Sequence, residues 1–206
     1  MFRAAGYRVE AAIMAVPEPL SRLGIIHRYH DQVQKLGYGR LTARDNHDAS
    51  YQGVRRAAET IDRDRIVDVA TVYRRGNQQL HTNHLDGASA WRWPAGTAAA
   101  IDAERQRPWT PEETKAFAAT VKQLFDEMGP EWHEELRDIV RLAAPLADRQ
   151  TPLPEIAEIS PAITAAAKAF PTSTRQSLPR QPAERDAVPP PPRASRETSR
   201  GEEPTR

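Results

Sequence analysis

Two closely spaced pairs of histidines are the residues in this chain that could hold a metal ion. His27 and His30 lie three residues apart, and so do His81 and His84. On a helix this spacing brings both imidazoles to one face, where a further ligand would complete a zinc-like site. Histidines with this spacing are more often surface or pocket-edge residues, and we therefore predict no metal site.

A second pattern with possible chemistry is the adjacent pair His47 and Asp48. An imidazole beside a carboxylate is the start of a general-base arrangement. A short acidic side chain at this place is also typical of a helix cap, and we expect Asp48 to cap a helix. No catalytic residue is assigned from the sequence.

The chain lacks the motif by which many enzymes hold nucleotide phosphates. Such a loop needs glycines that turn backbone N–H groups toward phosphate, followed by Lys and then Ser or Thr. None of the lysines is followed by Ser or Thr, and none has the required glycines before it; they are Lys35, Lys115, Lys122 and Lys168. We therefore expect that these 206 residues do not bind and split ATP by themselves.

Composition narrows the classes of partner. The formal net charge is +1 and no basic block is present, which argues against general attraction to nucleic acid or membranes. Cysteine is absent, which excludes disulfides, thiolate zinc sites and cysteine nucleophiles. Apolar runs are too short to cross a membrane, and no signal peptide opens the chain. A cytoplasmic location is predicted.

Hydrophobic spacing in the first ninety residues predicts an α/β fold. A strand over 7–16 has a continuously apolar second half, which is typical of a strand buried on both faces. A helix with apolar positions from Leu20 to Leu36 follows, and then a second one to about Thr60, capped by Asn46 or Asp48. Another strand over 66–73, a Gly-Asn turn and a short edge strand at 79–82 complete this part. Two convincing strands are few for a stable sheet, so strand partners are expected to be missing on the N-terminal side.

The remaining chain reads as helices and then a tail. Helical patterning begins at Thr97, and Thr110-Pro-Glu-Glu113 forms a capping box that opens a helix to about Met128. Further helices are predicted over 131–144 and, weakly, over 154–169. Four tryptophans could stack on bases, but we expect them to pack the added helices onto the sheet; they are Trp91, Trp93, Trp109 and Trp132. Residues 171–206, which include Pro189–Pro192, are predicted to be a disordered, proline-rich tail.

Short motifs in the first ninety residues resemble a known family. They are Ala-Val-Pro at 15–17, Arg-Tyr at 28–29, Thr-Ala-Arg at 42–44, His-Asp at 47–48 and the strand-like run 66–76. In order and type they resemble the C-terminal half of the zeta-toxin family, over roughly residues 4–87. These proteins are P-loop kinases of toxin–antitoxin systems that phosphorylate UDP-N-acetylglucosamine.

The resemblance implies site residues, cofactors and partners. Arg28 and Arg44 match family arginines that bind the phosphates of ATP, although the spacer before Arg44 is longer than usual. Guanidinium groups suit this role because they stabilise the charge of a transferring phosphoryl group. The complete family enzyme would use ATP and Mg²⁺, act on UDP-N-acetylglucosamine and meet an antitoxin.

We therefore expect a truncated, P-loop-NTPase-like parallel sheet at 1–90, an appended helical segment at 91–170 and a disordered tail at 171–206. The phosphate loop and the catalytic aspartate of the family would lie before the first residue, and the chain by itself would be inactive and bind no cofactor. Three hypotheses compete, in this order: a fragment of a toxin gene that is disrupted or has a misplaced start codon, a second chain of a split kinase, and a non-enzymatic interaction module.

Overall fold

The computed structural model describes residues 2–155 of the chain. The chain divides into two units, 1–170 and 171–206, and every described residue belongs to the first. The predicted tail at 171–206 lies outside the described residues. So does the predicted helix at 154–169, apart from its first two positions.

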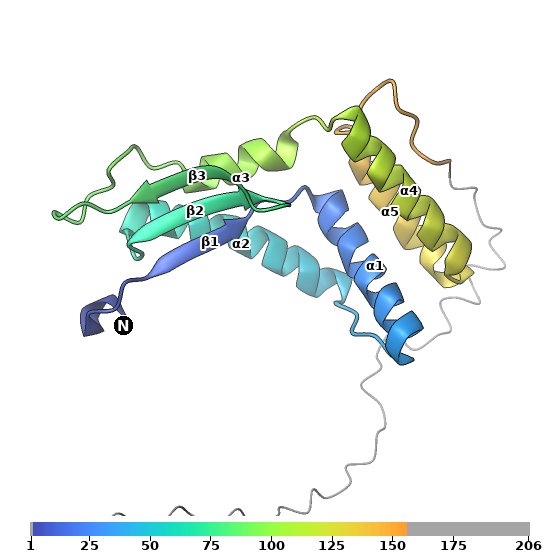
Figure 1. Cartoon of the computed structure of the whole chain (residues 1–206), viewed down its shortest axis with the longest axis horizontal. Coiled ribbons are helices and arrows are strands. Elements are labelled where there is room, and N and C mark those ends of the chain that lie inside the picture. Colours follow the sequence, from blue (N-terminus) through green and yellow to red (C-terminus); the bar gives the residue numbers. More distant parts are fainter. Residues whose placement is uncertain (1, 156–206) are drawn as a thin grey trace, which may run out of the picture. The chain divides into compact units, whose positions relative to one another are not determined.

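A mixed three-stranded sheet and the helices around it confirm the α/β class (Figure 1). The strands are β1 (Glu10–Met14), β2 (Val69–Arg74) and β3 (Gln78–His84), in the order β1-β2-β3. β1 pairs parallel to β2, with Ala11 opposite Ala70, while β3 runs antiparallel to β2. Residues 76 and 77 make the predicted turn between β2 and β3, both with positive φ.

β1 differs from the expected strand in length and in burial. Glu10, Ala12 and Met14 are exposed and the residues between them are half-buried, so the prediction of burial on both faces is wrong. Met14 is 45% exposed. The physical reason is that β1 is covered on one face alone. Exposed residues alternate with half-buried ones, so within residues 2–155 no element buries the face that carries Met14.

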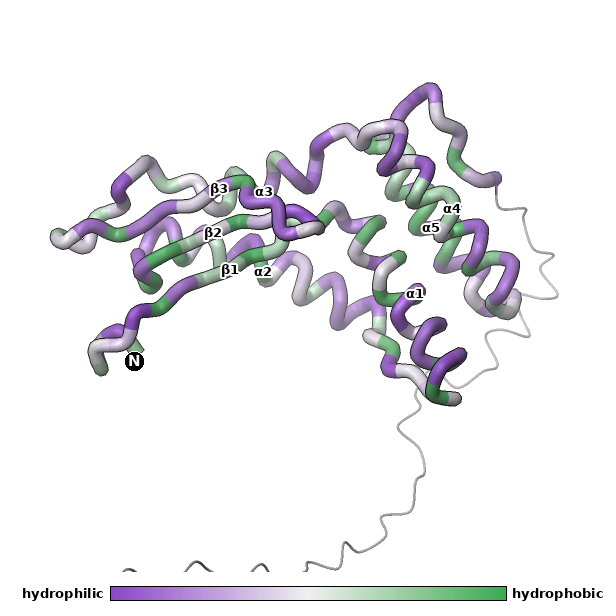
Figure 2. The backbone as a smooth tube through the Cα atoms, viewed as in Figure 1, coloured by the Kyte–Doolittle hydropathy of each residue, from purple (hydrophilic) through white to green (hydrophobic). Residues whose placement is uncertain are grey.

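Two helices cover one face of the sheet. They are α2 (Arg44–Asp64) and α3 (Thr97–Gln106), which lie side by side against it (Figure 1). Ala58 of α2 and Ile101 of α3 meet Val72 of β2 in a fully buried cluster. Figure 2 shows the contrast between the apolar stretch of β2 and the largely polar β3.

A second core lies among three other helices, α1 (Glu18–Leu36), α4 (Pro111–Glu127) and α5 (His133–Ala143). Short 3-10 turns, η1 (Arg3–Ala5) and η2 (Pro130–Trp132), complete the element list. Trp109 packs on Phe117, with ring centroids 5.0 Å apart, and Trp132 packs on Tyr29 of α1 at 5.2 Å. Trp109 thus packs on α4 and Trp132 on α1, within the helical core rather than on the sheet. The expectation that the tryptophans pack the added helices onto the sheet is therefore wrong for these two.

The start of α2 also differs from the sequence-based expectation. The helix begins at Arg44 with Ala43 as its N-cap, and no side chain caps it. Asn46 and Asp48 therefore lie inside the helix, and the predicted capping role of either is wrong. Asp48 instead accepts a hydrogen bond from the ring of His47, whose Nδ1 is 2.8 Å from Asp48 Oδ1.

The capping box of α4 is confirmed in full. The Thr110 hydroxyl accepts a hydrogen bond from the Glu113 backbone N–H at 3.2 Å, and Glu113 Oε2 accepts one from the Thr110 N–H at 2.8 Å. Reciprocal bonds of this kind satisfy two of the donors that a helix start leaves unpaired.

Replacing Thr110 should measurably weaken the protein. We expect Thr110→Ala to lower the free energy of unfolding by about 1 kcal/mol, because the α4 N-terminus loses its cap. The measurement is urea denaturation followed by circular dichroism. Thr120→Ala, the same change in the middle of α4, should leave stability nearly unchanged. Equal losses in both variants would contradict the capping role.

Candidate functional site

A pocket of about 400 Å³ opens where the two parallel strands end. Residues 15–17 follow β1 and form one wall, and Arg74 and Arg75 at the end of β2 form another. Leu23 of α1 and Phe117 of α4 supply apolar surface. In open α/β sheets, ligands bind beyond the carboxyl ends of the strands, and this pocket has that position.

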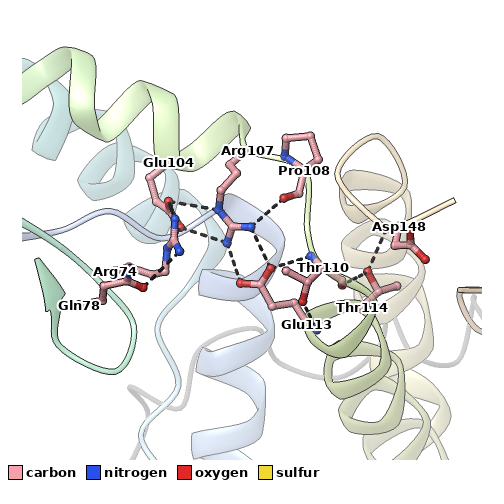
Figure 3. Close-up of polar contacts among 9 residues, drawn as sticks. All are labelled: Arg74, Gln78, Glu104, Arg107, Pro108, Thr110, Glu113, Thr114 and Asp148. Carbon is pink, nitrogen blue, oxygen red and sulfur yellow. Dashed lines mark hydrogen bonds and ion pairs between the residues drawn. The ribbon is translucent and has the colours of Figure 1, made fainter. Parts of the chain in front are cut away.

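A chain of ion pairs forms the polar wall of the pocket (Figure 3). Glu104 of α3 is only 4% exposed and accepts two hydrogen bonds from Arg74, at 2.7 and 2.5 Å. Arg107 donates to Glu104 at 3.3 Å and, through both terminal nitrogens, to Glu113 at 2.9 and 2.6 Å. These ion pairs therefore join β2, α3 and α4 through charged, mostly bidentate contacts.

These contacts shift the protonation equilibria of the ion-paired groups. The hydrogen bond to Glu113 raises the pKa of Arg107 above its ordinary value. The same bond lowers the pKa of Glu113, against the opposing effect of its partial burial. Both shifts favour the charged forms, so the ion pairs stay intact at neutral pH.

Arg75 is the charged group in the pocket that the carboxylates do not neutralise. Its Nη2 donates to the backbone carbonyl of Leu20 at 3.0 Å, and no carboxylate among residues 2–155 lies within ion-pair distance. The residue as a whole is exposed, yet desolvation of its guanidinium lowers the pKa of Arg75. The exposed fraction of Arg75 includes its aliphatic stem, whereas its guanidinium lies at the backbone carbonyl of Leu20.

The structure places the two predicted phosphate-binding arginines in different surroundings. Arg28 lies on α1, is exposed, and makes no hydrogen bond or ion pair within the described residues. Arg44 begins α2 and donates to Asp138 of α5 at 3.1 Å, with Glu135 3.6 Å away. These carboxylates raise the pKa of Arg44, chiefly through the bond to Asp138.

Glu135 also holds a buried arginine of α1. Arg22 is 3% exposed and donates through Nε to Glu135 Oε1 at 3.0 Å, with a second, very short contact from Nη2. One carboxylate thus bridges Arg22 and Arg44. Arg28 follows Arg22 by six residues, which turns it about 120° away around the helix, so it does not join this cluster.

His47 lies in a hydrogen-bonded series that has the order of a catalytic triad. Its Nδ1 is 2.8 Å from Asp48 Oδ1, and its Nε2 is 3.0 Å from Ser21 Oγ. A hydrolytic site also needs a cavity and oxyanion donors beside the hydroxyl. The pocket described above is not lined by any of the three residues. The series joins α1 to α2, and we assign it that structural role.

The histidine pairs do not form a metal-ligand cluster in the part of the chain that the structure describes. His30 is buried, with Nε2 3.2 Å from Glu127 Oε2, and His27 lines the pocket. His81 packs against Gly96, and His84 lies at the end of β3. Among the described helices, none has the length and apolar character needed to span a bilayer.

Comparison with known protein families finds a match in the first part of the chain. Residues 1–86 match the family model described as zeta toxin. The match includes α1, α2 and the whole sheet, and it ends before α3, α4 and α5. No curated protein matches the chain. The match covers 86 of the 206 residues, which is less than half of the chain.

Sequence reasoning did not identify the charged wall of the pocket. Arg74 and Arg75 lie in the 66–76 run that carries the family resemblance, at the end of a predicted strand. Their position at the carboxyl edge of a parallel strand is a signal that could have identified them. Glu104 and Arg107 gave no such signal, because only the packing of α3 on the sheet brings them to Arg74.

Removal of the Glu104 charge should destabilise the protein strongly. We expect Glu104→Gln to lower the free energy of unfolding by about 3 kcal/mol, because Arg74 and Arg107 then lose the carboxylate between them. Chemical denaturation measures the change. The control is Asp126→Asn, which removes an exposed partner of Lys122 and should change stability by about 0.5 kcal/mol or less. A similar small effect for both variants would show that the Glu104 pairs contribute little.

Low pH should lower the stability of the folded protein, partly through protonation of Glu113. Because the folded-state pKa of Glu113 is lowered, its contribution to stability is complete above the ordinary pKa of 4.5 and is lost as pH falls through the folded value. We expect Glu113→Gln to lose less stability than the unchanged protein when melting temperatures are compared at pH 7 and below pH 4.5. Glu112→Gln, a change in the same helical turn, should keep the pH dependence of the unchanged protein. Parallel curves for all three proteins would contradict the assignment.

Proposed function

We propose that residues 1–86 form the C-terminal half of a zeta-toxin-like kinase that transfers the γ-phosphate of ATP to UDP-N-acetylglucosamine. The observation that carries the proposal is the family match over this segment. It is supported by the parallel pairing of β1 and β2, which is the strand arrangement expected for that part of the enzyme. In the complete enzyme, ATP would bind with Mg²⁺, which would neutralise charge on the phosphates.

Arg28 and Arg44 are the proposed phosphate-binding residues. The exposed guanidinium of Arg28 has no described partner and is free to contact an anion. Arg44 is held by Asp138 and Glu135, and it would have to exchange these carboxylates for phosphate oxygens. Both groups offer a planar set of donors that matches oxyanion geometry.

Phosphoryl transfer would need groups that these 206 residues do not supply. The chain contains no phosphate loop, and we propose that this loop and a general base come from another polypeptide segment. Two features of the sheet support such docking. The outer edge of β1 is unpaired within the described residues, and Met14 on the uncovered face is 45% exposed. An exposed parallel edge strand offers unpaired backbone groups to a further strand.

Without that segment the chain is proposed to be catalytically inactive. The split-kinase alternative, in which a second chain supplies the loop, is favoured by the open β1 edge. The non-enzymatic alternative assigns partner binding to the segment after residue 90. An antitoxin and a cytoplasmic location belong to the kinase proposal.

The test separates phosphate binding from phosphate transfer. With Mg²⁺-ATP and UDP-N-acetylglucosamine we expect no transfer of labelled phosphate by the chain alone. Tripolyphosphate should nevertheless bind, and Arg28→Ala should weaken that binding about tenfold, since a charge-assisted hydrogen bond is lost. Calorimetric titration measures both proteins. Arg56→Ala, which removes an exposed arginine of α2, is the control and should bind as before.

Two outcomes would contradict the proposal. Transfer of phosphate by the isolated chain would show that it is not inactive. Binding of tripolyphosphate that is equally weakened in Arg28→Ala and Arg56→Ala would show a general charge effect rather than a phosphate site.

A further inference from the structure

We propose that the pocket at the carboxyl ends of β1 and β2 binds a small organic anion, which has one carboxylate or phosphate group on a compact apolar body. In this site Arg75 binds the anionic group, and apolar side chains of α1 and α4 enclose the remainder. The site is distinct from Arg28 and Arg44, neither of which lines the pocket. The inference does not rest on the proposed kinase function.

The charge balance of the pocket singles out Arg75. Arg74 is bound to Glu104 through two nitrogens, and Arg107 is bound to both Glu104 and Glu113. The charges of these two arginines are therefore already compensated. Arg75 has a backbone carbonyl as its hydrogen-bond acceptor and no carboxylate within ion-pair distance among residues 2–155. An oxyanion beside it would supply the missing countercharge.

Gly24 leaves room for the guanidinium of Arg75 beside α1. A Cβ atom at position 24 would lie 2.7 Å from Arg75 Nη2, which is closer than real contacts allow. Glycine inside α1 lowers helix propensity, and here it leaves the space in which Arg75 reaches the carbonyl of Leu20. The guanidinium of Arg75 thus lies beside α1, next to Gly24 and the carbonyl of Leu20.

The remaining lining limits the ligand. Much of the lining is apolar; it includes Ala15, Val16, Pro17, Leu20, Leu23 and Phe117. A volume of about 400 Å³ is within the range of small-molecule sites. The charged lining sums to +1, because Arg74, Arg75 and Arg107 face Glu104 and Glu113. A polyanion such as a nucleoside triphosphate would therefore keep most of its charge uncompensated and is disfavoured.

Six of the fifteen lining residues come from outside the segment that matches the zeta-toxin family. Glu104, Arg107 and the α4 residues lie beyond residue 86, while α1 and the strand ends lie within it. The pocket therefore exists only because α3 and α4 are added to the matched segment.

The first experiment measures binding to the full chain with simple probes. Phenyl phosphate and benzoate share an aromatic body and differ in the anionic group, whereas benzyl alcohol has the same body without charge. Saturation-transfer NMR and calorimetry should show saturable binding of at least one anion, at least about tenfold tighter than benzyl alcohol. The better of the two anions identifies a phosphate or a carboxylate as the natural group. Absence of saturable binding by both anions would overturn the proposal.

Two variants with matched controls test the geometry. Arg75→Gln should weaken anion binding about tenfold, while Arg56→Gln, an equal change of charge on α2, should not. Ala116→Leu fills the pocket without a change of charge and should also weaken binding, whereas Ala119→Leu, on α4 but outside the pocket, should not. Melting temperatures verify that each variant is folded. Unchanged binding in folded Arg75→Gln, or equal losses in a variant and its control, would overturn the assignment.

Discussion

The buried carboxylate of Glu104 is the group on which the arrangement of this protein depends. It lies between two arginines, Arg74 at the end of β2 and Arg107 at the end of α3, and Arg107 continues to Glu113 in the first turn of α4. A carboxylate that is 4% exposed is tolerated only because both neighbours compensate its charge. The contacts tie the sheet to the helices that follow it, and they set the direction in which α4 leaves α3.

Carboxylates from the later part of the chain repeatedly meet arginines from the first part. Glu104 binds Arg74, Glu135 binds buried Arg22, and Asp138 binds Arg44. Guanidinium groups bind carboxylates and phosphates in the same bidentate geometry, so acidic residues of an added segment can compete with phosphate for them. The segment after residue 86 therefore does more than cover apolar surface. It determines which arginines keep an unsatisfied charge, and within the described residues Arg28 and Arg75 are two that do.

Local patterns predicted much of the secondary structure. The capping box at 110–113 and the turn at 76–77 were correct because each depends on neighbouring residues. Predictions that depend on distant partners were less accurate. The apolar run of β1 predicted full burial, but full burial requires elements packed on both faces of a strand. Asp48 has a side chain that can cap a helix, but α2 begins four residues earlier. The carboxylate of Asp48 pairs with His47 instead.

The sequence by itself determined the α/β class, the family resemblance of the first ninety residues, and the absence of a phosphate loop among the 206 present. These follow from periodicity and from motifs whose members are close in the chain. Only the tertiary structure decided which arginines are neutralised and where a pocket lies. Arg74 meets Glu104 across thirty residues and Arg44 meets Asp138 across ninety-four. Electrostatic pairing acts through space, so no local pattern in the sequence records it.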